Sequence, residues 1–447
     1  MILDTRIRLK SITVYYPEFK TVQLGANELN REKRTLIVGA GLAGLCCATE
    51  LQKKGITCSI YESDNCVGGR VKTDLVDGFR LDRGFQVLLD SYPEARQALD
   101  FGRLNLGSFE PGALVRYQGR FSRFVDPWRR PLSFFSTLVS PLATFSDKIR
   151  MARLRHSLFR IGDKELKKSN QSTQEYLRDF GFSSKVIDHF FRPFFGGVFL
   201  ESDLATSSAK FKYLFRMFSS GLATLPANGM QAIANQLAEG LPNETINFES
   251  RVDALTDQGL LLANGQEVAG DAIVLATPAH VTAKLLDESL RHESRQPESQ
   301  QVGCIYFSAD RSPLNSKTLV VNGEGSGPIN TVCVPSDICS TYAPAGKALV
   351  SVSVLANHLH NDSEVTVSAV RDQLEDWFGD SVKEWSHLKS YRISHALPSQ
   401  TPDRLTLDMP IKRDSRIYVC GDHTGIASIQ GAMESGRLAA EAISSQS

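Results

Sequence analysis

Neither sign of charge is in excess in this sequence of 447 residues, because 50 lysines and arginines balance 50 aspartates and glutamates. This balance argues against a general attraction to nucleic acid, and we expect no such partner. No apolar run approaches the ~18 residues of a membrane-spanning helix. The eight cysteines form no Cys-x-x-Cys pair and follow no secretory signal. We therefore expect reduced thiols in an intracellular protein that is cytoplasmic or peripherally attached to a membrane.

Motifs of several enzyme classes are also missing. The sequence contains neither a Gly-x-Ser-x-Gly turn nor a Walker phosphate loop. His358 and His360 lie close together, but no cysteine or third histidine accompanies them. A solvated loop is the simpler interpretation of this pair, and we predict no metal site.

What the sequence does contain is a strand–helix–strand unit over residues 35–62. The run TLIV (35–38) is continuously apolar, as in a buried parallel strand. A helix pattern follows and ends at Gly55, and ITCSIYE (56–62) is the next strand. These features predict a parallel βαβ unit.

Gly39, Gly41 and Gly44 form a G-x-G-x-x-G turn between the first strand and the helix. Such glycines let the backbone approach a pyrophosphate, whose charge the helix N-terminus stabilises. Glu62 stands at the end of the second strand, where a carboxylate can bind both ribose hydroxyls. The combination predicts a dinucleotide site. The alternative is a tight turn with an incidental acidic residue.

The segment SDNCVGGRVKT (63–73) separates FAD from NAD as the bound dinucleotide. Gly68 and Gly69 can expose backbone N–H groups, and Arg70 supplies a fixed cation for phosphate oxygens. An NAD site needs no such second clamp, so the segment favours FAD. Taken alone, it is equally compatible with a turn that carries a solvated arginine.

These motifs together resemble the flavin-binding start of the family that includes monoamine oxidases, protoporphyrinogen oxidases and phytoene-type desaturases. RLDRGFQVLL (80–89) resembles the next segment of the desaturase and protoporphyrinogen oxidase branches. The resemblance implies that Gly84 approaches the flavin ring, and that Phe85 and Gln86 can line it. LPANGMQAIANQLA and INFESRVDAL resemble the middle piece, in which Val252 offers backbone groups to the adenine; DAIVLATPAH (271–280) is predicted as the buried strand that follows.

The stretch CGDHTGIASIQGAMESGRLAAEAI (420–443) resembles the C-terminal signature of the same family. The resemblance implies that Asp422, after Gly421, binds the ribityl hydroxyls of FAD. It also implies that N–H groups near Ile429 and Gln430, at a helix start, face the N1–C2=O edge of the flavin. An oriented dipole there stabilises the charge of the reduced ring. The alternative is an ordinary strand-to-helix crossover with an exposed aspartate.

The predicted cofactor is FAD, and the residues predicted to bind it are Gly39, Gly41, Ala43, Gly44, Glu62, Gly68, Gly69, Arg70, Gly84, Phe85, Gln86, Val252, Gly421, Asp422, Ile429 and Gln430. The cofactor performs the difficult step in this family, so we assign no catalytic side chain. His423 is placed either near the flavin or in a packing role.

Phenylalanine and basic residues concentrate in the middle of the chain. Sixteen of the 24 phenylalanines lie between Phe121 and Phe218. Between Arg116 and Arg216 there are 19 lysines and arginines against 9 acidic residues. Such helices suit an apolar substrate, isoprenoid or polycyclic, and possible peripheral contact of this segment with a membrane. The alternative is a helical core with a solvated basic face.

Two other functions stay open at this stage. Amine oxidases of the resembled family place an aromatic residue shortly before the C-terminal helix, and Ser428 stands there in this sequence. An amine or amino acid oxidase is therefore the second hypothesis, weakened by the missing cage. Rab escort and GDP-dissociation-inhibitor proteins resemble this fold without binding flavin, so a lipid-binding protein is the non-enzymatic alternative.

The predicted fold class is α/β. A Rossmann-like FAD-binding domain is assembled from discontinuous segments, and a mixed α+β substrate domain has an antiparallel sheet and Phe-rich helices. We assign residues 35–100, 220–300 and 400–447 to the FAD-binding domain and residues 101–219 and 301–399 to the substrate domain. Residues 1–34 are a predicted N-terminal extension.

Overall fold

The computed structural model describes residues 34–124, 142–166, 168, 170–290, 298–403 and 411–446. All but the last residue of the predicted N-terminal extension lies outside these ranges. Sheets and helices are mixed along the chain, which confirms the α/β class. The division into two named domains stays a prediction.

A five-stranded parallel sheet gathers segments from the start, middle and end of the chain. Its strand order is β10-β2-β1-β14-β20, and every neighbouring pair is parallel. The strands are β1 (Thr35–Val38), β2 (Cys58–Tyr61), β10 (Ile246–Asn247), β14 (Ala272–Leu275) and β20 (Ile417–Val419). The apolar run 35–38 is buried throughout, as its composition predicts.

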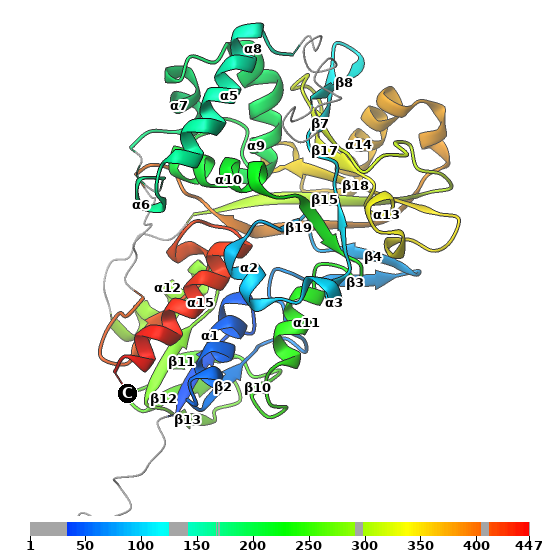
Figure 1. Cartoon of the computed structure of the whole chain (residues 1–447). Helices are drawn as coiled ribbons and strands as arrows, with labels where there is room; N and C mark the ends of the chain where they lie inside the picture. Colours follow the sequence, from blue (N-terminus) through cyan, green and yellow to red (C-terminus); the bar gives the residue numbers. More distant parts are fainter. Residues whose placement is uncertain are drawn as a thin grey trace, which may run out of the picture.

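Helices α1 (Leu42–Lys53) and α15 (Ile429–Ser444) pack against each other, although they come from opposite ends of the chain. Figure 1 shows them side by side in blue and red below the larger sheet. The contact is close at Gly436, where a Cβ atom would lie 2.1 Å from the Ala43 carbonyl oxygen. Segments from near the two ends of the described chain therefore lie side by side.

A seven-stranded sheet forms the second layer. Its order is β19-β15-β18-β17-β16-β7-β8, and the pairs are antiparallel except β16 with β7. The strands are β7 (Ala113–Tyr117), β8 (Arg120–Phe124), β15 (Ser299–Ala309), β16 (Leu319–Asn322), β17 (Ile329–Cys333), β18 (Ala348–Leu355) and β19 (Ser386–Pro398). Helix α14 (Ser363–Phe378) packs its apolar residues into one face of this sheet.

The helices of the phenylalanine-rich middle segment lie on the other side of the seven-stranded sheet, where α9 contacts β16 and β17 (Figure 1). They are α5 (Phe145–Arg160), α7 (Thr173–Asp179), α8 (Ser184–Val186), the π-helical turn Ile187–Phe191, α9 (Arg192–Phe199) and α10 (Ser208–Ser220). Ser172 caps α7 in a reciprocal capping box with Glu175.

The remaining elements are short. They are β3 (Thr73–Val76), β4 (Phe79–Asp82), β5 (Leu88–Leu89), α2 (Pro93–Ala98), α3 (Phe101–Leu104), β6 (Leu106–Ser108), α6 (Asp163–Leu166), β9 (Ala223–Pro226), α11 (Ala232–Glu239), β11 (Val252–Leu255), β12 (Gly259–Leu262), β13 (Glu267–Ala269), α12 (Ala279–Leu290) and α13 (Pro335–Ile338). The order β5-β9-β6 forms a small sheet that crosses the predicted domain boundary, because β6 and β9 were assigned to different domains.

One predicted strand is too long. The prediction placed a strand over residues 271–280, but β14 ends at Leu275 and α12 begins at Ala279. The Pro278 carbonyl accepts hydrogen bonds from Val281 N and Thr282 N, as at a helix start. The apolar run thus ends before the turn, and Thr277 and Pro278 are the residues that mark it.

Candidate functional site

The glycine-rich turn after β1 has the geometry that a pyrophosphate requires. Gly39 has φ +104°, a conformation that L side chains rarely adopt. A Cβ atom at Gly44 would lie 2.1 Å from the Gly39 carbonyl oxygen, so α1 can start close to β1 only with glycine there. At Gly41 no described atom would lie within 4 Å of a Cβ. The turn therefore leaves open space at the N-terminus of α1, where an anion is stabilised.

The second glycine pair lies directly beside this turn. Gly68 N donates to the Ala40 carbonyl at 3.0 Å, and Gly41 and Gly68 form a parallel bridge. A Cβ atom at Gly69 would approach the Gly41 Cα at 3.4 Å. The two predicted phosphate-binding segments are thus brought together, although which cofactor atoms they contact stays a prediction.

The Glu62 carboxylate lies next to the same turn. It accepts hydrogen bonds from Ala40 N at 2.7 Å and from Asp64 N at 3.0 Å. These donors orient the side chain, which is buried. An ionised carboxylate has about four acceptor positions, so capacity is left for ribose hydroxyls.

Arg70 and Asp422 form an ion pair at 2.5 Å across 352 positions of sequence. Arg70 also donates to the Ala396 carbonyl at 3.0 Å. Burial alone would raise the pKa of Asp422, but the adjacent Arg70 guanidinium outweighs it and lowers this pKa. The prediction gave the two side chains separate parts of FAD, and the structure shows that they also contact each other.

Buried polar atoms without a protein partner surround this ion pair. Both ring nitrogens of His423 and the Gln86 Oε1 atom have none among the described residues, while Gln86 Nε2 donates to the Arg70 carbonyl at 3.0 Å. Burial lowers the pKa of His423, which favours the neutral ring. Buried polar groups are normally hydrogen-bonded, so this cluster fits a polar ligand such as the central part of FAD.

The remaining residues predicted to bind FAD lie in different surroundings. The Gln430 side chain accepts a hydrogen bond from Glu94 N at 2.9 Å, so its amide faces α2. Ile429 opens α15, and Ser428 caps this helix by accepting from Gly431 N at 3.0 Å. Val252 begins β11 and is buried. The predicted helix N-terminus is therefore present at the start of α15. Ser428 occupies the position at which the amine-oxidase hypothesis needs an aromatic ring.

Gly84 and Phe85 connect the candidate cofactor site to the substrate side. Gly84 has φ +98°, and a Cβ atom there would lie 2.8 Å from Ile393 Cδ1. Phe85 meets Phe109 edge-on, with 6.2 Å between ring centroids. Phe85 also lines a pocket, and its contact with the flavin ring stays a prediction.

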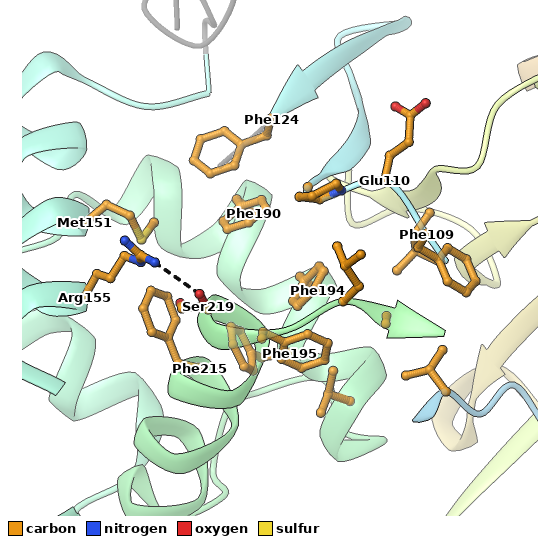
Figure 2. A pocket seen from close by; sticks show the side chains of 18 of the residues that line it. Phe109, Glu110, Phe124, Met151, Arg155, Phe190, Phe194, Phe195, Phe215 and Ser219 are labelled. Atoms are coloured by element: carbon orange, nitrogen blue, oxygen red, sulfur yellow. Dashed lines mark hydrogen bonds between the residues drawn. The ribbon is translucent and has the colours of Figure 1, made fainter. Parts of the chain in front are cut away.

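That pocket is apolar and has a volume of about 230 Å³. Figure 2 shows Phe109 at one end, Arg155 and Met151 on α5 at the other, and a series of aromatic rings between them. The phenylalanines among the lining residues are Phe85, Phe109, Phe124, Phe190, Phe194, Phe195, Phe215 and Phe218. The sequence showed the enrichment in phenylalanine, and only the fold shows that so many of these rings surround one space.

The few polar groups of the pocket are bound by protein atoms. Asp147 accepts hydrogen bonds from Thr144 and Ser183. Burial opposes ionisation of Asp147, but these hydrogen bonds outweigh it and lower the pKa of the carboxyl. Arg155 donates to the Ser219 carbonyl at 3.1 Å, the contact drawn in Figure 2. Asp147 is therefore held by protein donors, and its carboxylate completes the capping box of α5 with Thr144.

Sequence reasoning did not identify Asp82, which is buried at the end of β4. Its carboxylate accepts from Thr73 Oγ1 at 2.6 Å, Met230 N at 2.9 Å and the Tyr342 hydroxyl at 2.9 Å. Burial raises the pKa of Asp82 to about 6 in spite of these donors. The carboxylate joins the β3–β4 hairpin, next to Gly84, to residues of the second layer.

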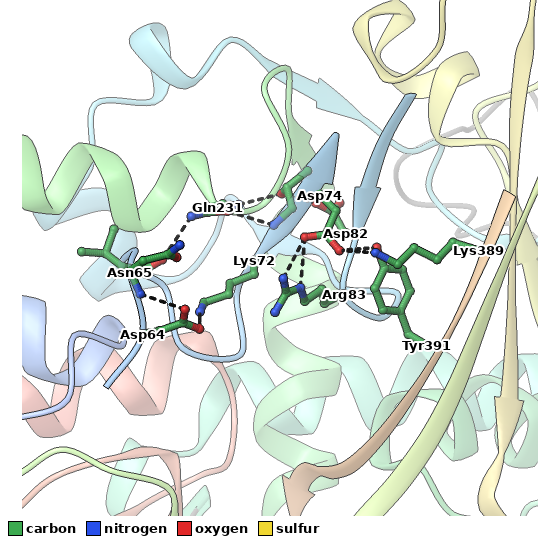
Figure 3. Close-up of polar contacts among 11 residues, drawn as sticks. Asp64, Asn65, Lys72, Asp74, Asp82, Arg83, Gln231, Lys389 and Tyr391 are labelled. Atoms are coloured by element: carbon green, nitrogen blue, oxygen red, sulfur yellow. Dashed lines mark hydrogen bonds and ion pairs between the residues drawn. The ribbon is translucent and has the colours of Figure 1, made fainter. Parts of the chain in front are cut away.

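Asp74 on β3 makes a second junction of the same kind. It receives hydrogen bonds from Arg83, and from Lys389 and Tyr391 on β19 (Figure 3). Asp74 holds the hairpin against β19 of the seven-stranded sheet, whereas the Asp82 carboxylate links it to Met230 and to Tyr342 in the turn Ser340–Tyr342. The signal that could have identified Asp82 is its place in RLDRGF, directly before the predicted flavin contact.

Lys210 on α10 was also not predicted. It is almost fully buried and has no hydrogen-bond or ion-pair partner in the part of the chain that the structure describes. Burial lowers the pKa of Lys210 to about 8, with Asp422 acting in the opposite direction. A buried cation within electrostatic reach of Asp422 adds to the polar character of the cofactor site.

Within the described ranges, no group of three or more His, Cys, Asp or Glu residues is arranged to hold a metal ion. None of the helices in those ranges combines the length and apolar composition needed to cross a membrane.

Comparison with known sequences gives related enzymes. The chain is 23% identical to 15-cis-phytoene desaturase of Capsicum annuum over 458 residues, which covers 91% of this chain and 77% of the relative. It is 28% identical to protoporphyrinogen oxidase 2 of Arabidopsis thaliana over 169 residues, covering 37% and 32% of the two chains.

Comparison with solved structures gives the same fold. An oxidoreductase from Methanosarcina mazei has a TM-score of 0.72 at 18% identity, covering 91% of this chain and 100% of that one. Putrescine oxidase bound to putrescine has a TM-score of 0.68 at 17% identity, covering 92% and 99%.

A model of the family of flavin-containing amine oxidoreductases matches residues 42–444, which include Gly44 of the first glycine turn, the Gly68–Gly69 pair and the Arg70–Asp422 pair. The chain therefore belongs to this family and is an FAD-dependent oxidoreductase.

Proposed function

We propose that this enzyme oxidises an elongated apolar compound, isoprenoid or polycyclic, by hydride transfer from a C–H bond to the flavin. The observation that carries the proposal is the pocket lined by phenylalanines, one of which is Phe85. Phe85 is followed by Gln86, which contacts Arg70 of the cofactor site. The pocket and the cofactor site are therefore adjacent through consecutive residues.

When bound, FAD supplies the hydride-accepting chemistry. The residues of this chain have binding and orienting roles. Glu62, Arg70 and Asp422 would hold the cofactor, and the N-terminus of α15 would stabilise negative charge near the reduced ring. The aromatic rings of the pocket bind apolar surface and exclude water from the reaction. Hydride transfer from a C–H bond requires no charged side chain at the substrate, and the engaged state of Asp147 agrees with this.

The similarity to 15-cis-phytoene desaturase supports an apolar substrate, since that relative is named for an isoprenoid hydrocarbon. Oxidation of a simple amine has less support. Ser428 stands where a cage aromatic is expected, and its hydroxyl caps α15. Phenylalanine alone also attracts a cation less strongly than tryptophan or tyrosine.

Anaerobic reduction of the bound flavin tests the proposal. The purified holoenzyme is mixed with detergent-solubilised polyene hydrocarbons, with porphyrinogens and with amines, and the flavin absorbance is followed. We expect bleaching by a member of the first two classes and none by amines. Bleaching by amines alone would overturn the proposed substrate class.

A further inference from the structure

Helix α5 has apolar residues on two opposite faces. Leu154 and Leu158 are buried against the protein. Phe145, Ile149 and Phe159 are 70%, 48% and 48% exposed. At 3.6 residues per turn these three side chains fall within a sector of about 80°, directly opposite the two leucines. A helix of this kind has an outer apolar stripe that the described protein leaves uncovered.

This stripe stands out on the molecule. Among the described residues only seven large apolar side chains are exposed, and three of them are on this one helix face. A shallow cleft lined by Ala152, Arg155, His156 and Phe159 runs along the same face. Single exposed apolar residues need no explanation, but a row of large ones along one helix marks an interaction surface.

Charge limits the kind of partner. The sixteen residues of α5 include five lysines and arginines and one acidic residue, Asp147, which is buried. Arg153 and Arg160 lie along one edge of the stripe, and Lys148 and Arg155 along the other, by the same helical geometry. An apolar stripe between two basic edges is the pattern of a helix that lies in the interface of an anionic bilayer.

One flank of the same helix forms part of the proposed substrate pocket. Lys148, Met151 and Arg155 of α5 line it, and Figure 2 shows Met151 and Arg155. The apolar pocket therefore lies beside the edge of the outer stripe that carries Lys148 and Arg155. An apolar substrate of the class proposed above would be dissolved in a bilayer, so a docking face next to the pocket would shorten its path.

We propose that the outer face of α5 docks on the surface of an anionic lipid bilayer, with Phe145, Ile149 and Phe159 inserted among the lipids and Arg153 and Arg160 at the headgroups. The use of this contact for substrate supply rests on the proposed function. The contact itself does not, because it depends only on the surface of the helix.

Vesicle sedimentation of the full-length holoenzyme tests the contact. Vesicles of phosphatidylcholine alone are compared with vesicles that contain about one third phosphatidylglycerol. We expect at least about tenfold tighter binding to the anionic vesicles and weaker binding as salt increases. The triple variant Phe145→Ser, Ile149→Ser, Phe159→Ser should lose at least about tenfold in binding. Equal binding by this variant, or no preference for anionic vesicles, would overturn the proposal.

Matched controls separate the stripe from general effects. Leu75→Ser changes a side chain that is 71% exposed elsewhere on the surface, and should bind vesicles as the wild type does. The pair Arg153→Gln, Arg160→Gln should bind neutral vesicles unchanged and lose its preference for anionic ones. If the triple variant instead changes a dimer to a monomer in gel filtration and keeps vesicle binding, the face joins two copies and the proposal is wrong.

Flavin reduction distinguishes this proposal from the proposed function. The triple variant should bleach normally with detergent-solubilised substrate and more slowly with substrate delivered in anionic vesicles. Failure of every apolar compound to bleach the wild type would remove the proposed substrate and leave vesicle binding as the test of docking.

Discussion

At the scale of single residues, the candidate cofactor site depends on a few side chains whose positions are set by backbone donors or by a single ion pair. Glu62 is oriented by two backbone N–H groups. Asp422 is oriented by Arg70. His423 and Gln86 carry buried atoms with no partner in the described part of the chain. These groups fit a polar ligand better than an empty interior.

Replacing Glu62 by alanine should weaken FAD binding at least about tenfold, because the acceptor for Ala40 N and the predicted ribose contact are both lost. The ratio of flavin to protein absorbance after gel filtration measures the effect. Glu50→Ala, which removes a carboxylate paired with Lys53 on the outer side of α1, serves as the control and should retain FAD.

Asp422→Ala should also weaken FAD retention by at least about tenfold, since Arg70 loses its partner and the flavin half of the site loses an acceptor. Equilibrium titration with FAD, followed by flavin fluorescence, provides the dissociation constant. If both this variant and Glu62→Ala kept full cofactor, the assignment of the two half-sites would be wrong.

At the scale of elements, two contacts hold the cofactor site together. The first is the crossing of α1 and α15 at Gly436. The second is the β3–β4 hairpin, which Asp74 attaches to Lys389 on β19 (Figure 3) and Asp82 attaches to Tyr342. Each contact places a predicted cofactor segment against a distant part of the chain.

Gly436→Ala should reduce the free energy of unfolding by about 2 kcal/mol, because the new methyl group would meet the Ala43 carbonyl oxygen and push the helices apart. Urea unfolding followed by tryptophan fluorescence measures this change. Gly162→Ala is the matched control, since no described atom lies within 4 Å of its added Cβ. An equal loss in both variants would contradict the close helix crossing.

Asp82 should make stability depend on pH. Its pKa in the folded protein is about 6, above the value of ~3.9 for an unfolded chain. Asp82 therefore contributes stability below about pH 4, and this contribution, about 3 kcal/mol, is lost as pH rises through about 6. Relative to Asp82→Asn, which does not titrate, the wild type should lose stability from pH 4 to 7. Parallel pH profiles in urea unfolding would show that Asp82 is ionised throughout.

At the scale of the whole molecule, the strands β5, β9 and β6 lie between the cofactor segments and the helical layer. Ala223 on β9 lines the apolar pocket. A larger side chain there would occupy space inside the pocket.

Ala223→Phe should fill much of the pocket and lower the rate of flavin reduction by an apolar substrate at least about tenfold, while FAD content is unchanged. Stopped-flow absorbance measures the rate, and Ala223→Ser is the control of similar size. Reduction at the wild-type rate by Ala223→Phe would show that substrates reach the flavin by another route.

Local patterns in the sequence determined the parts of this protein that depend on near neighbours. The glycine spacing around Gly41, the apolar strand 35–38 and the cap at Ser172 follow from backbone geometry within a few residues. The strand predicted over residues 271–280 failed at its end, because Thr277 and Pro278 interrupt the apolar run and mark the turn before α12.

Only the tertiary structure decided what depends on long-range contact. It paired Arg70 with Asp422, placed Asp82 beside Tyr342, and surrounded one pocket with phenylalanines from several elements. The composition of the middle segment was equally consistent with a solid core. The difference lies in which faces of distant helices and strands meet, and that choice is made by packing of the whole chain and not by any short stretch of it.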